Sequence, residues 1–152
     1  MSRRLKTFRN RWQKLIPGSF DSVLVMEYID YNDVAGIYDI YAEASYDFKF
    51  FTSRIVSGER VLELTSGTGR LSIPLIRAGA QLACVDISQG MLDVLKGKLT
   101  TEKLKAEILC ADIQHLPFET EFNMAILPFQ SFMELAGRKR QLTTLRSVCQ
   151  TT

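Results

Sequence analysis

The feature that most constrains the fold is a short apolar run that ends in a glycine-containing turn and leads into a second apolar segment. Residues 60–65 are predicted as a buried strand, residues 65–69 as a tight turn, and residues 70–78 as a helix with Pro74 near its first turn. A strand, a tight turn and a helix N-terminus together let a ligand approach the main chain closely. The sequence therefore predicts a ligand site at the end of this strand.

An acidic residue ends the next apolar run. Asp86 closes a predicted strand over 81–86. A carboxylate at the tip of a strand beside a glycine-containing turn is placed to accept hydrogen bonds from a ribose diol. The combination is typical of a site for a cofactor that contains adenosine.

Two classes of cofactor compete for this site. The dinucleotide fingerprint requires Gly-x-Gly-x-x-Gly, whereas residues 67–72 read Gly-Thr-Gly-Arg-Leu-Ser, so Ser72 replaces the third glycine. Glu63, inside the strand, would repel a diphosphate but suits a cofactor that carries an amine and a sulfonium. An NAD-dependent oxidoreductase is therefore the weaker alternative.

The segment Glu63-x-Thr65-x-Gly67-x-Gly69 resembles the first motif of the class I S-adenosylmethionine-dependent methyltransferases, acidic-x-Gly-x-Gly-x-Gly, with Thr65 in place of the first glycine. The later motifs of the family follow in the same order, at residues 84–92, 110–112 and 122–132. Four ordered motifs are far more specific than one glycine-rich turn. The resemblance implies a methyltransferase that uses S-adenosyl-L-methionine.

The resemblance also implies a role for each motif. Glu63 would hold the ammonium of the cofactor, Asp86 both ribose hydroxyls, and Asp112 the adenine amine. The other predicted cofactor-binding residues form the turn around the methionine part, the walls around the adenine, the crevice and the lid: Thr65, Ser66, Gly67, Thr68 and Gly69; Ile87, Met91 and Ile113; Leu127; and Tyr38. Two alternatives stay open, since Asp112 also suits a turn and Met91 a core position. Arg70, at the start of the helix, is expected to be exposed.

Residues 1–58 are predicted as an N-terminal helical lead-in, and 59–152 as the cofactor-binding part of a methyltransferase domain. Tyr38, Asp39, Tyr41 and Asp47 resemble the lead-in of many small-molecule methyltransferases, where this segment covers the cofactor; ordinary helix packing is the alternative. A helix with Phe48, Phe51, Ile55 and Val56 is expected to close at Gly58. No catalytic base is assigned, because methyl transfer depends mainly on alignment of the reacting groups.

Alternating strands and helices predict an α/β fold, a Rossmann-like doubly wound parallel sheet behind N-terminal helices. The strands are expected at 60–65, 81–86, 106–111 and 122–128. The resemblance implies strand order 3-2-1-4, with the family's C-terminal strands missing. The fourth strand should then lie at a sheet edge and favour self-association. A non-catalytic cofactor-binding fragment or pseudo-enzyme is the alternative to an active enzyme.

The fourth strand also bears on the methyl acceptor. Residues 127–130 read Leu-Pro-Phe-Gln, whereas enzymes of this class that methylate exocyclic amines of bases typically carry Asn or Asp-Pro-Pro-Tyr or Phe there. A small-molecule acceptor is therefore favoured over RNA. The basic, amphipathic segment 1–16 is predicted as a helix that packs on the domain; contact with nucleic acid or anionic lipid is the alternative. A further helix is expected over 138–149, with Leu142, Leu145 and Val148 on one face.

Composition narrows the class of protein. The chain has no apolar run of about 18 residues, so no membrane span is expected, and its basic start lacks the apolar region of a secretory signal. Cys84, Cys110 and Cys149 lack metal-ligand spacing, so we expect no metal site and reduced thiols in a cytoplasmic protein, with Cys84 and Cys110 inside apolar strands. The single histidine, His115, is expected in a loop.

Overall fold

A computed structural model describes residues 30–42, 44–119 and 122–152 of the 152-residue chain. Its centre is one parallel sheet in the order β3-β2-β1-β4, which confirms the predicted order 3-2-1-4. The strands are β1 (Arg60–Leu64), β2 (Gln81–Asp86), β3 (Glu107–Cys110) and β4 (Met124–Ile126). Within the described residues, β4 forms one edge of the sheet and β3 the other.

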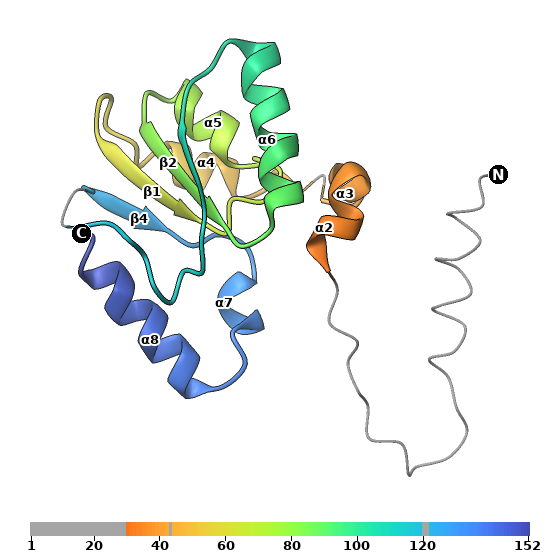
Figure 1. The fold of residues 1–152 in the computed structure, drawn as a ribbon. Helices are drawn as coiled ribbons and strands as arrows, with labels where there is room; N and C mark the ends of the chain where they lie inside the picture. Colours follow the sequence, from red (N-terminus) through yellow and green to blue (C-terminus); the bar gives the residue numbers. More distant parts are fainter. Residues whose placement is uncertain (1–29, 43, 120–121) are drawn as a thin grey trace, which may run out of the picture.

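Only short helices precede the sheet in the described residues, whereas the two long helices, α6 and α8, come after its strands begin (Figure 1). These helices are α2 (Tyr31–Val34), the 3-10 turn η2 (Ala35–Ile37), α3 (Tyr38–Tyr41), α4 (Phe48–Thr52), α5 (Ser72–Arg77), α6 (Gln89–Glu102), α7 (Ser131–Glu134) and α8 (Arg138–Cys149). The helix expected over 138–149 is α8, whereas α4 ends earlier than predicted and α5 begins later. The segment 1–16 lies outside the described residues. None of the helices in the described ranges has the length and apolar character needed to cross a bilayer.

The side chains of β1 alternate between two apolar cores. Val61 belongs to the core beneath α5 and α6, and Leu62 and Leu64 belong to the core on the opposite face. Figure 1 shows α5 and α6 on one side of the sheet and α8 on the other. By this alternation, Glu63 points to the α5 side, a placement that matters for its chemistry.

The long helix α6 begins where the sequence predicts. Ser88 is its N-cap, with an Oγ that accepts a hydrogen bond from the Met91 amide at 3.3 Å. Leu92, Leu95 and Leu99 are buried against the sheet. The cap therefore places the N-terminus of α6 directly after Asp86, at the carboxyl end of β2.

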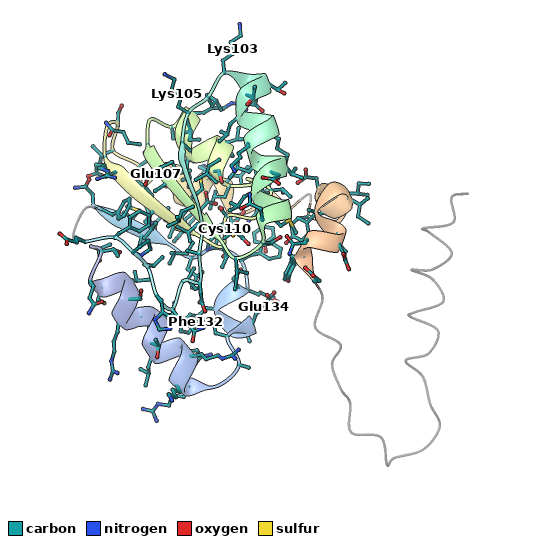
Figure 2. The ribbon with its side chains drawn as sticks, in the orientation of Figure 1. Lys103, Lys105, Glu107, Cys110, Phe132 and Glu134 are labelled. Atoms are coloured by element: carbon teal, nitrogen blue, oxygen red, sulfur yellow. The ribbon has the colours of Figure 1, made fainter. Side chains whose placement is uncertain are left out.

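Two of the predicted elements carry exposed apolar or thiol side chains. On α8 the side chains of Leu142 and Leu145 are exposed, while Thr144 and Ser147 are buried, because the Ser147 hydroxyl faces inward and accepts a hydrogen bond from the Leu116 amide at 2.9 Å. Cys110 is exposed, since β3 is an edge strand whose outer side no other described strand covers (Figure 2).

Candidate cofactor-binding site

The turn after β1 has a backbone that glycine favours at three positions. Thr65, Gly67 and Gly69 have φ values of 53°, 55° and 86°. A left-handed backbone is costly for a β-branched residue. The Thr65 hydroxyl donates to the Leu64 carbonyl at 2.6 Å. Thr65 therefore adopts the left-handed conformation that glycine adopts readily, and it does so under strain.

The two glycines of the turn serve different purposes. A Cβ on Gly69 would collide with the side chain of Leu95, so Gly69 lets the turn pack closely against α6. A Cβ on Gly67 would meet no atom within 4 Å. The turn is therefore packed on the side of Gly69 and open on the side of Gly67, where a ligand has room.

Asp86 joins the turn to the next strand. Ser66 N donates to the Val85 carbonyl at 3.0 Å, which carries the turn alongside the end of β2. The carboxylate of Asp86 then accepts hydrogen bonds from the amides of Gly67 and Ser88, each at 2.8 Å. Burial raises the pKa of Asp86, and the two amides act in the opposite direction. A carboxylate can accept about four hydrogen bonds, so capacity remains for ribose hydroxyls.

Glu63 is only 1% exposed and lies beneath the turn. Its Oε2 accepts a hydrogen bond from the Ser72 hydroxyl at 2.6 Å, and the Cys84 sulfur lies 4.0 Å away. Burial raises the pKa of Glu63 to about 8. Glu63 is therefore mainly protonated at neutral pH, and the contact with a cofactor ammonium stays a prediction.

The residues predicted around the adenine are not equally accessible. Ile87 is 63% exposed next to Asp86, whereas Met91 and Ile113 are buried. Asp112 accepts a hydrogen bond from the Gln114 amide at 2.9 Å, the geometry of a turn-opening Asp. Ile87 is thus the apolar side chain of this group that faces outward, and the adenine-binding roles of all four residues stay predictions.

The lead-in is attached to the turn by a polar cluster. The Thr68 hydroxyl donates to Asp39 Oδ1 at 2.6 Å, and Lys98 Nζ reaches Asp39 Oδ2 at 2.6 Å and the Thr68 carbonyl at 2.9 Å. Burial acts to raise the pKa of Asp39, but the hydrogen bonds from Lys98 and Thr68 outweigh it and hold that pKa below its usual value. Asp39 therefore connects α3 to both the turn and α6.

The first described residues of the lead-in contact α6 and α7. Asn32 Oδ1 accepts hydrogen bonds from the Ser88 hydroxyl at 2.9 Å and the Gly90 amide at 2.8 Å. The Tyr31 hydroxyl donates to Glu134, at 3.1 and 3.2 Å from its two oxygens, and Figure 2 shows Glu134 on α7. The start of α2 therefore contacts both α7 and the N-terminus of α6, which lies beyond the carboxyl end of β2.

Tyr38 lies near charged side chains of the turn, the lead-in and α7. Its side chain is half-buried, and burial is the main cause that raises its pKa. The negative charges of Glu134 and Asp86 add to this effect, while Arg70 opposes it. Tyr38 therefore lies near Asp86, and its role in covering the cofactor stays a prediction.

The expectation that Arg70 is exposed is wrong. Its two terminal nitrogens bind both carboxylate oxygens of Asp47, each at 2.7 Å, and its side chain is 14% exposed. The partner lies far away in sequence, so no local pattern around Arg70 pointed to the pair. The available signal was Asp47 itself, an acid of the lead-in motif.

A model of the methyltransferase domain matches residues 61–151, more than half of the chain. The chain belongs to the methyltransferase domain family. The demethylmenaquinone methyltransferase of Clavibacter sepedonicus is 39% identical over 66 residues, which make up 43% of this chain and 26% of that protein. The malonyl-[acyl-carrier protein] O-methyltransferase of Priestia megaterium is 29% identical over 119 residues, 69% of this chain and 41% of that protein.

A solved structure supports the same family. The S-adenosylmethionine-dependent methyltransferase from Clostridium acetobutylicum ATCC 824 matches with a TM-score of 0.64 and 26% identity, over 80% of this chain and 53% of that chain. The predicted methyltransferase class and its cofactor, S-adenosylmethionine, are thus confirmed at the level of the family. The chain spans about half the length of this structure and less of the two curated relatives.

Two surface hollows of this methyltransferase domain lie away from the turn. One, of about 390 Å³, is lined by the 114–116 loop and α8, and the other, of about 350 Å³, by α6 and the start of β3. Neither contains a residue of the predicted cofactor set.

Leu127 follows β4 and packs partly against the core with Ile113. The structure therefore brings together Tyr38, the turn and Asp86, and places Met91, Ile113 and Leu127 in or against the core.

Proposed function

We propose that this chain is the cofactor-binding part of a methyltransferase that transfers a methyl group from S-adenosylmethionine to a small molecule. The hydrogen bond of 2.8 Å between the Gly67 amide and Asp86 carries the proposal. It joins an acidic residue at the end of β2 to the open side of a glycine turn after β1. A cofactor with a ribose and an amino-acid tail needs these two features side by side.

The residues of the chain would bind and orient the cofactor. Asp86 has free acceptor capacity for the ribose hydroxyls, the exposed face of Ile87 offers an apolar wall for the adenine, and Gly67 leaves room beside the main chain. S-adenosylmethionine itself supplies a methyl group activated by its positive sulfonium. The protein's part is then to align the acceptor with that methyl group, which needs no covalent catalysis.

The acceptor is proposed to be a small molecule rather than a nucleic acid. The residues after β4, Leu127-Pro128-Phe129-Gln130, lack the polar motif typical of base-methylating enzymes. Two relatives are named for demethylmenaquinone and for malonyl-[acyl-carrier protein], neither of them a nucleic acid. The first observation favours an acceptor that enters beside this apolar loop, and the second favours an acceptor other than a nucleic acid.

Calorimetry with S-adenosylhomocysteine and with NAD tests the cofactor. We expect S-adenosylhomocysteine to bind and NAD not to bind. Asp86→Ala should weaken S-adenosylhomocysteine binding by roughly 1.5–3 kcal/mol, because hydrogen bonds to a charged acceptor are lost. Asp93→Ala is the matched control, since Asp93 is an exposed acid on α6 and its loss should leave affinity unchanged. Binding of NAD without binding of S-adenosylhomocysteine would contradict the proposal.

A non-catalytic binding fragment is the second candidate. It is favoured by the position of β4 at the edge of the sheet in the described residues, where an unpaired strand invites association. We expect residues 1–152 to transfer methyl groups weakly or not at all and to self-associate. Sedimentation and formation of S-adenosylhomocysteine should be measured together, over a panel of small amines, acids and phenols. A stable monomer that turns over one of these acceptors would contradict the prediction.

A further inference from the structure

Arg70 is joined to segments that lie far apart in sequence. Its guanidinium binds both oxygens of Asp47 at 2.7 Å and accordingly ties the lead-in to the start of α5. The same group lies 5.3 Å from the ring centroid of Phe48 and 5.0 Å from that of Phe129, within the range of cation–π attraction. Because Arg70 directly follows the glycine turn, one side chain contacts the lead-in and the loop after β4 at once.

The Arg70–Asp47 pair is well shielded. The two side chains are 14% and 13% exposed, compared with 64% and 31% for Arg77 and Glu102, the ion pair that joins α5 to α6. The hydrogen bond from Arg70 lowers the pKa of Asp47. A shielded pair with two parallel hydrogen bonds holds its geometry, whereas an exposed pair contributes little.

Phe129 is held in an uncommon conformation at the other end of this contact. Its φ is 63°, a left-handed value that is strained for a bulky residue and persists only where the surroundings impose it. The guanidinium of Arg70 faces its ring, and the ring is otherwise exposed. Phe129 belongs to the loop after β4, on the side where the proposed function places the acceptor.

We propose that Arg70 is a positioning residue that couples cofactor binding to the acceptor side of the site. Through Asp47 it holds the lead-in against the cofactor turn, and through the ring of Phe129 it holds the loop after β4. Arg70 itself touches none of the predicted reacting groups. The inference rests on the proposed function, since it assumes that S-adenosylmethionine binds at the turn.

The test is a pair of double-mutant cycles read by the dissociation constant of S-adenosylhomocysteine. Arg70→Met and Asp47→Asn should each weaken binding about ten-fold, and the double variant should be no weaker than Arg70→Met, because each change breaks the same contact. Arg70→Lys should restore only part of the affinity, since an ammonium cannot make two parallel hydrogen bonds. Phe129→Leu should weaken binding in the native background and have no effect in Arg70→Met.

Arg77→Met is the matched control, because Arg77 is a nearby arginine, on α5, that makes an exposed ion pair. It should leave the affinity unchanged. Melting temperatures are recorded for all variants, and Asp47→Asn and Phe129→Leu keep the test decisive if Arg70→Met does not fold. Lower melting temperatures with unchanged affinity, or additive effects in both cycles, would overturn the inference and leave the proposed function standing. Native protein that does not bind S-adenosylhomocysteine would overturn both.

Discussion

Glu63 offers a quantitative test of how burial raises the pKa of a carboxyl beneath the turn 65–69. The carboxyl is 1% exposed, its nearest polar partner is the neutral hydroxyl of Ser72, and its pKa is raised to about 8. In the unfolded chain the same group should titrate near its ordinary value. We consider Glu63→Gln, because an amide of the same shape still accepts the hydrogen bond from Ser72 and does not titrate.

The magnitude follows from linkage between protonation and folding. A raised pKa in the folded state means that the stability contribution is complete below the unfolded pKa and is lost as pH rises through about 8. At pH 7 the free energy of unfolding of the native protein is about 3 kcal/mol lower than at low pH, because each unit of pKa shift corresponds to about 1.4 kcal/mol. The amide of the variant does not titrate, so its contribution to stability does not change with pH. Glu63→Gln should therefore be close to native stability at pH 5. At pH 8 it should be more stable than the native protein by about 4 kcal/mol.

Urea unfolding at pH 5, 6, 7 and 8 measures this difference, provided that the dependence on urea concentration is the same for both proteins. Taking the difference between variant and native protein cancels the titration of every group that does not interact with Glu63. A difference that stays constant with pH would refute the reasoning about Glu63. A variant that becomes less stable than the native protein as pH rises would show that the carboxylate has a cationic partner.

Two further predictions concern the turn and the N-terminal segment. Thr65→Gly should stabilise the domain by about 1 kcal/mol in urea unfolding, because it removes the strain of a left-handed β-branched residue. Thr101→Gly, within α6, is the control and should destabilise the domain. A loss of stability on Thr65→Gly would contradict the interpretation that Thr65 is strained. Deleting residues 1–16, which lie outside the described residues, should leave S-adenosylhomocysteine affinity nearly unchanged; salt-sensitive RNA binding in a gel-retardation assay that disappears on this deletion would instead favour the RNA methyltransferase alternative.

Much of the framework was predictable from the sequence because it depends on local patterns. Apolar runs located the four strands, Ser88 marked the start of α6, and the small residues of 65–69 marked the turn. The strand order came from the resemblance to a known family, and the sheet confirms it. Thr65, which takes the place of the motif's first glycine, still has the left-handed backbone that glycine adopts readily.

Only the tertiary structure decided how the charged groups are partnered. The pairs of Arg70 with Asp47 and of Lys98 with Asp39 join residues that are distant in sequence, and no periodic pattern encodes them. Burial of Glu63 likewise depends on α5 packing over β1, which sets the environment of its carboxyl and hence its pKa. Hydrophobic periodicity records which face of an element is buried. Electrostatic partners depend instead on the distances between packed elements, which exist only once the chain has folded.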